Sequence, residues 1–113
     1  MKKIFALLAI ALSANAFAAG NIEAGKAAAQ KYNCASCHGA DFNSPVDPSY
    51  PKLAGQHADY LEHALKAYQR GGNASNGRGN AIMGGMAKPL SATEIKDISA
   101  YLASLKGTLV LRK

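Results

Sequence analysis

The stretch "YNCASCHGAD", residues 32–41, decides how the rest of this chain is interpreted. It contains both cysteines of the chain, Cys34 and Cys37, and His38 follows the second one directly. Because the cysteines are three positions apart, a helical turn would place both thiols on one side. Four interpretations of this cluster compete: a structural disulfide, a redox-active dithiol, a zinc site and covalent attachment of haem.

Three of these interpretations explain the cluster poorly. A disulfide suits an exported chain, but a bridge this local closes a tiny loop and contributes little stability through chain entropy. A redox-active dithiol normally opens a helix after a strand, and no strand pattern precedes Cys34. Zinc would need two more ligands, and the spacing of His57 and His63 does not place them on adjacent turns of one helix face.

Covalent haem attachment explains the whole cluster. The spacing C-x-x-C-H is the signature of a porphyrin held by two thioethers, with the histidine free to meet the iron. We therefore expect one covalently bound haem c per chain, attached to Cys34 and Cys37, with His38 as an iron ligand. A large apolar cofactor would also supply core volume, because a domain this small buries only roughly two-thirds of its unfolded surface and this chain has no tryptophan.

Residues 1–18 have the pattern of a secretory signal peptide. Met1-Lys2-Lys3 gives a positive start, an apolar run follows, and Ala16-Phe17-Ala18 has small residues where a signal peptidase reads the chain. The apolar run is shorter than the about 20 residues of a membrane span. We expect cleavage after Ala18, no stable membrane insertion, and a mature domain of residues 19–113 in the bacterial periplasm.

The charge of the mature chain argues against nucleic acid as a partner. The sequence has 13 Lys and Arg against 7 Asp and Glu, and loss of Lys2 and Lys3 leaves 11 against 7, a net charge of +4. These charges are spread along the chain without a long basic run. Such a distribution is compatible with brief encounters with acidic protein surfaces.

Three main helices are predicted, and no segment has a useful strand period, so the predicted fold class is all-α. The first helix spans about Glu23 to Tyr32, with Asn21 as its N-cap. The second spans about Gln56 to Arg70 and ends at Gly71-Gly72.

The third helix carries the strongest signals. Ser91 and Glu94 form a capping box, an apolar stripe follows, and Gly107 is the expected C-cap. Before it lies "GGNASNGRGNAIMGGMAKP", residues 71–89, with six glycines in nineteen residues. We expect this segment to be a functional loop, because long loops in compact domains usually have a role.

Together these segments resemble a class I c-type cytochrome, and more closely one half of the dihaem cytochromes of the c-four group or their single-haem relatives. The matching residues are "AGK" (24–26), "CASCHG" (34–39), "YPKLAGQ" (50–56), "YL" (60–61) and "MGGMAKPLSATEIKDISAYL" (83–102). The resemblance implies a small class I cytochrome c fold, with helices and loops wrapped around a covalently attached haem. Because the chain stops after one haem domain, we do not expect a two-haem function.

The resemblance also implies roles for single residues. His38 becomes the proximal ligand, and the backbone carbonyl of Pro51 accepts a hydrogen bond from its other ring nitrogen, which would fix the tautomer. Gly25 and Tyr101 fall where the first and last helices cross. Arg78 matches a basic position that contacts a haem propionate.

The sixth iron ligand is expected from the glycine-rich segment. Its two methionines are Met83 and Met86, and each could instead be apolar filling against the haem. The resemblance favours Met83 as the ligand, with Met86 as the alternative.

The loop after His38 departs from the family pattern. Where relatives usually have a glycine after "HGAD" (38–41), this chain has Phe42, which cannot adopt a positive φ without cost. The path of this loop therefore does not carry over from the resemblance.

The expected function is electron transfer and not catalysis. With His38 and a methionine in both axial positions, the iron has no open site for a substrate, and methionine ligation raises its potential. We expect a carrier between a quinol-linked donor and a terminal oxidase or reductase, a monomer or weak homodimer that meets acidic partner surfaces. The lysines expected around the haem edge are Lys26, Lys31, Lys52 and Lys88.

Two other functions stay open. The chain could be the haem subunit of an exported dehydrogenase, with its tail "TLVLRK" (108–113) as a docking element. If neither methionine reaches the iron, a five-coordinate haem would bind small ligands or carry out peroxidatic chemistry.

Overall fold

The computed structural model describes residues 20–111, so the expected signal peptide lies outside the described residues. Within this range the all-α prediction is confirmed, since every regular element is a helix. The elements are α1 (Ile22–Lys31), α2 (Ala35–His38), α3 (Ala58–Arg70), α4 (Ala81–Ala87) and α5 (Ala92–Ser104). None of these helices has both the length and the apolar character that crossing a membrane requires.

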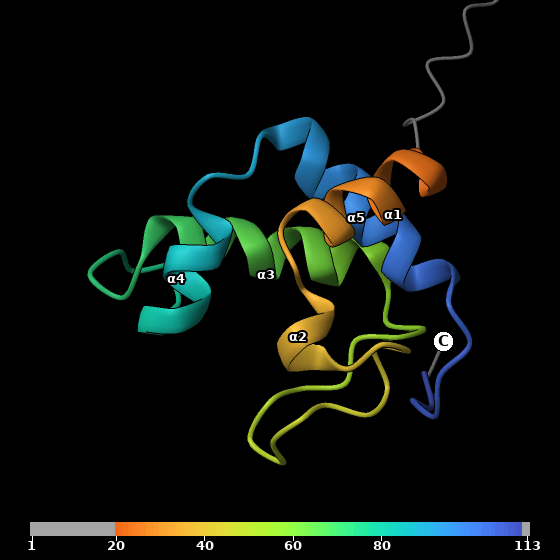
Figure 1. Cartoon of the computed structure of the whole chain (residues 1–113). Helices are drawn as coiled ribbons and strands as arrows, with labels where there is room; N and C mark the ends of the chain where they lie inside the picture. Colours follow the sequence, from red (N-terminus) through yellow and green to blue (C-terminus); the bar gives the residue numbers. More distant parts are fainter. Residues whose placement is uncertain (1–19, 112–113) are drawn as a thin grey trace, which may run out of the picture.

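The first and last helices cross in close contact, as predicted (Figure 1). Gly25 of α1 lies against the backbone of α5, where an added Cβ would collide with the carbonyl oxygen of Asp97 and lie 2.8 Å from the Cβ of Tyr101. The Asn21 N–H donates to the Asp97 carboxylate at 2.8 Å. The crossing therefore requires glycine at position 25.

Helices α1 and α5 begin at the capping side chains that the sequence predicted. The Asn21 side chain accepts from the Ala24 N–H at 2.9 Å, which caps α1. The capping box of α5 is complete, because the Ser91 Oγ accepts from the Glu94 N–H at 3.0 Å and Glu94 accepts from the Ser91 N–H at 3.1 Å. Glu94 also accepts from the Tyr32 hydroxyl at 3.0 Å, which ties the start of α5 to the end of α1.

The other helices pack on this pair. Helix α3 lies against α5, and α4 lies against α3 (Figure 1). The buried core includes Leu61 of α3 together with Ile95, Ile98 and Leu102 of α5. The two short helices, α2 and α4, both contribute side chains to the lining of one cavity.

The glycine-rich segment differs from the prediction because it contains helix α4. The Asn80 side chain accepts from the Met83 N–H at 2.9 Å and caps this seven-residue helix. The sequence signal was weak, because Gly84 and Gly85 lower the helix propensity of a short segment.

The predicted C-cap of the last helix was wrong. Helix α5 ends at Ser104 and its C-cap is Leu105. Gly107 instead allows the chain to pass the backbone of Ala54, whose carbonyl oxygen an added Cβ would strike. Thr108 is tied to the body, because its N–H donates to the Asn43 side chain at 3.2 Å, whereas Val110 is 90% exposed.

The contrast between two helical glycines gives a stability prediction. Gly25→Ala should lower the free energy of unfolding by about 2 kcal/mol, because the methyl group has no space at the helix crossing. Gly85→Ala is the matched control, since nothing lies within 4 Å of its Cβ position. The control should raise the free energy of unfolding by about 0.5–1 kcal/mol through helix propensity. Denaturant unfolding of the haem-loaded variants measures both, and equal effects would contradict the close crossing.

Candidate functional site

One cavity of about 510 Å³ lies between α2, α3, α4, α5 and the loop before α3. Its volume is in the range of small-molecule and cofactor sites. The apolar wall contains Leu61 and Leu65 from α3, Leu90, and Ile98 and Leu102 from α5. The cavity therefore occupies the place where side chains would otherwise close the core of the domain.

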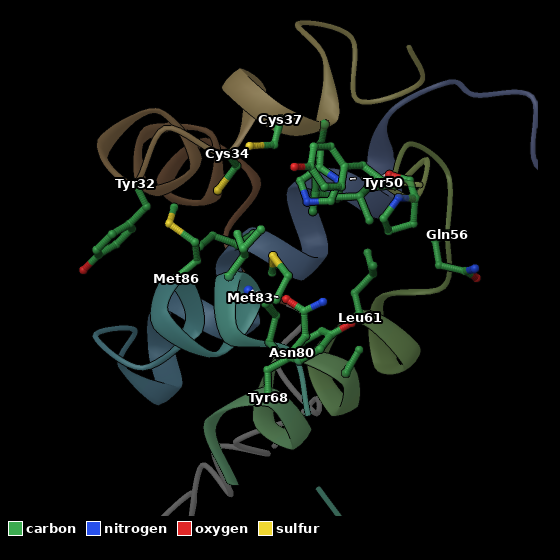
Figure 2. Close-up of a pocket in the computed structure, with 18 of the residues that line it drawn as sticks. Tyr32, Cys34, Cys37, Tyr50, Gln56, Leu61, Tyr68, Asn80, Met83 and Met86 are labelled. Carbon is green, nitrogen blue, oxygen red and sulfur yellow. Dashed lines mark hydrogen bonds between the residues drawn. The ribbon is translucent and has the colours of Figure 1, made fainter. Parts of the chain in front are cut away.

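Helix α2 brings the cysteine and histidine side chains to one side of this cavity. Both Cys34 and Cys37 are half-buried and not in a disulfide, and both line the cavity. Figure 2 shows their side chains next to each other at one edge of the pocket. Burial raises the pKa of the Cys34 thiol.

The imidazole of His38 is buried, with 6% of the residue exposed, and it lines the same cavity. Its Nδ1 lies 2.9 Å from the carbonyl oxygen of Pro51. Because a carbonyl oxygen can only accept a hydrogen bond, Nδ1 carries the proton and donates a hydrogen bond to the Pro51 carbonyl. The other nitrogen, Nε2, keeps its lone pair and is available to a metal ion.

The two methionines enter the cavity from α4. Figure 2 shows the Met83 side chain in the pocket beside Asn80, with the Met86 sulfur displaced toward Tyr32. Met86 is 39% exposed, whereas Met83 is half-buried. The Asn80 side chain accepts from the Met83 N–H at 2.9 Å, which holds Met83 in the first turn of α4.

Arg78 lies at the edge of the cavity between two tyrosines. Its guanidinium donates to the Tyr60 hydroxyl at 3.1 Å and lies 5.5 Å and 5.6 Å from the ring centres of Tyr60 and Tyr68. Among residues 20–111 no carboxylate forms an ion pair with it. The cation is therefore held in place without a neutralising protein group, which suits an anionic group bound in the cavity.

The other two histidines lie away from this site. His57 and His63 are exposed, and neither lines the cavity. In the part of the chain that the structure describes, no three His, Cys, Asp or Glu side chains gather as metal ligands. The zinc interpretation thus has no ligand set within these residues.

The residues present fit a covalently attached haem. Two thiols on one side, an imidazole with a fixed tautomer, a thioether from α4, an apolar wall and a cation at the edge supply each kind of contact that a porphyrin needs. The sequence analysis missed Asn80, Tyr60 and Tyr68, which hold Met83 and Arg78. An Asn directly before an apolar run was the available signal for the cap.

Comparison with known proteins agrees with this site. The family model "Cytochrome c" matches residues 22–106. Cytochrome c4 of Stutzerimonas stutzeri is 41% identical over 107 residues, which cover 91% of this chain and 50% of the relative. Cytochrome c-554(548) of Halomonas halodenitrificans is 45% identical over 75 residues, 63% of this chain and 82% of the relative.

A solved structure is similar in fold as well. The crystal structure of reduced recombinant cytochrome c4 from Pseudomonas stutzeri matches with a TM-score of 0.70 and 40% identity, over 80% of this chain and 48% of that chain. The chain thus spans about half the length of these cytochrome c4 relatives.

The two thiols give a test of attachment. The pigment of the haem-loaded protein should stay with the chain in acidified acetone, because thioether bonds resist extraction. Cys34→Ala combined with Cys37→Ala should release all of it, and each single substitution should retain it through the remaining bond. Ser36→Ala, between the two cysteines and outside the cavity lining, is the control and should retain the pigment. Extraction from the unaltered chain would count against covalent attachment.

Proposed function

The chain belongs to the cytochrome c family and binds haem c covalently, and from this premise we propose that it carries single electrons in the bacterial periplasm through a haem ligated by His38 and Met83. The proposal rests on the observation that side chains of α2 and α4 line the same cavity. An imidazole whose Nδ1–H is engaged lines this cavity together with a thioether. These are the two kinds of side chain that would hold a haem iron in this cavity.

Haem c, when bound, supplies one-electron oxidation and reduction. The chain contributes what controls that chemistry. Cys34 and Cys37 fix the cofactor, and the hydrogen bond from His38 to Pro51 makes the imidazole a stronger donor. As an iron ligand, Met83 would raise the reduction potential and would leave no open position for a substrate, so the proposed role is that of a carrier and not an enzyme.

Arg78 has a separate part in the proposal. Its guanidinium is already oriented by Tyr60 and Tyr68, so a haem propionate would gain a cation without the entropy cost of ordering that side chain. Moving the negative charge of a propionate out of water costs free energy, and the nearby guanidinium of Arg78 would offset part of that cost.

The proposed partners are redox proteins with acidic docking surfaces, namely a quinol-linked donor and a terminal oxidase or reductase. Exposed apolar side chains of α4, Ile82 and Met86, line the cavity and would meet a partner at its rim. Lys52 also lines the cavity, and exposed Lys88 follows α4 directly. Lys26 faces a separate hollow beside Ala29 and is therefore a poor candidate for this contact.

The axial methionine can be identified by substitution. Met83→Ala should abolish the sulfur-to-iron absorption band of the oxidised protein and let the reduced protein bind carbon monoxide rapidly. Met86→Ala, the matched control one helical turn away, should preserve both properties of the unaltered protein. The reverse outcome would assign Met86 as the ligand. Rapid carbon monoxide binding by the unaltered protein would favour the five-coordinate alternative.

If Lys52 and Lys88 contact an acidic partner, the rate of electron transfer should depend on salt concentration. Lys52→Gln and Lys88→Gln should each slow electron transfer to an acidic redox partner at low ionic strength by roughly threefold, and salt should remove the difference. Lys96→Gln, an exposed charge on α5 outside the cavity lining, is the control and should leave the rate unchanged. Stopped-flow rates measure this. A rate insensitive to salt in a stable complex would favour the subunit of a dehydrogenase.

A further inference from the structure

Phe42 has a backbone conformation that its side chain disfavours. Within residues 20–111, two residues other than glycine have a positive φ: Asn33 at 57° and Phe42 at 55°. Asparagine visits this left-handed region readily because its short polar side chain can bond locally, whereas a bulky side chain there is strained. Such an outlier persists only where its surroundings enforce it, and it points to a local role.

The aromatic ring of Phe42 is what holds it there. Only 4% of the residue is exposed, and its ring packs edge-on against Tyr101 of α5, with ring centres 6.0 Å apart at an angle of 77°. It belongs to the same buried cluster as Ala29 of α1 and Leu102 of α5. The ring thus anchors the loop after α2 to the crossing of the first and last helices.

The backbone of Phe42 connects this anchor to the loop that carries Pro51. Its carbonyl oxygen accepts two hydrogen bonds, from the Leu53 N–H at 2.8 Å and the Ala54 N–H at 3.0 Å. Pro51 has no N–H of its own, so the bonds of its neighbours must fix its position. The Phe42 carbonyl therefore holds Leu53, which lies two residues after Pro51, and the Pro51 carbonyl accepts from His38 Nδ1 at 2.9 Å.

We propose that Phe42 is a positioning residue that holds the Pro51 carbonyl on His38 and thereby sets how strongly the imidazole donates to the iron. The inference rests on the proposed function, since it takes His38 as an iron ligand. A well-placed acceptor on Nδ1 raises the basicity of the ligand and favours ferric iron. Loosening that acceptor should weaken the donation and raise the reduction potential.

Phe42→Gly tests whether the buried ring of Phe42 is needed to position Pro51. Glycine adopts a φ of 55° without strain, so the substitution relieves the backbone while it removes the buried anchor. In the haem-loaded, reduced protein we expect the NMR signal of the His38 Nδ1–H to move upfield and its exchange with solvent to become about tenfold faster, as local opening becomes easier. The reduction potential should shift upward.

Two further variants make the result decisive. Phe42→Leu keeps part of the buried volume and should show smaller shifts in the same directions, which covers the case in which the glycine variant fails to fold. Ile95→Ala removes buried side-chain volume from α5 at a position that does not line the cavity. It should lower stability without moving the Nδ1–H signal or the potential.

Unchanged His38 signals and potential in Phe42→Gly, or in Phe42→Leu where only that variant folds, would overturn the inference. Equal shifts in Ile95→Ala would overturn it too, because a general loss of packing would then explain the effect. Loss of His38 ligation in the unaltered protein would instead overturn the proposed function, so the two failures are distinguishable.

Discussion

The rest of the structure depends on a core that the chain does not close with its own side chains. Packed protein interiors have few voids larger than a water molecule, yet the middle of this small domain has a cavity of about 510 Å³. Leucine and isoleucine side chains of α3 and α5 face that cavity, and they would lose packing contacts if it stayed empty. A planar apolar group that fills this cavity would therefore stabilise the packed core as well as supply the redox chemistry.

The helices that surround the cavity contribute different parts of the binding site for such a group. Helices α1 and α5 cross in close contact, which Gly25 makes possible. Helix α2 brings two thiols and the imidazole of His38 to the cavity, and α4 brings Met83. An iron held by His38 and Met83 would not need to change its ligands between oxidation states, and this would suit the proposed electron transfer.

Local signals allowed much of this to be predicted from the sequence. The spacing of Cys34, Cys37 and His38 and the capping box at Ser91 are properties of short segments, and they identified the attachment motif and the last helix. Contacts between distant segments could not be predicted in that way. The Phe42 ring packs against Tyr101, the need for Gly107 depends on Ala54, and the glycine-containing helix α4 packs against α3.

The most direct test of this account compares the chain produced without haem with the matured protein. Near-ultraviolet circular dichroism and NMR report whether side chains are fixed in one packing. The account predicts that the haem-free chain lacks fixed tertiary packing and has no cooperative unfolding transition, whereas the haem-loaded protein has both. A haem-free chain with well-dispersed signals and the same unfolding midpoint as the loaded protein would contradict it, because the core would then close without the cofactor.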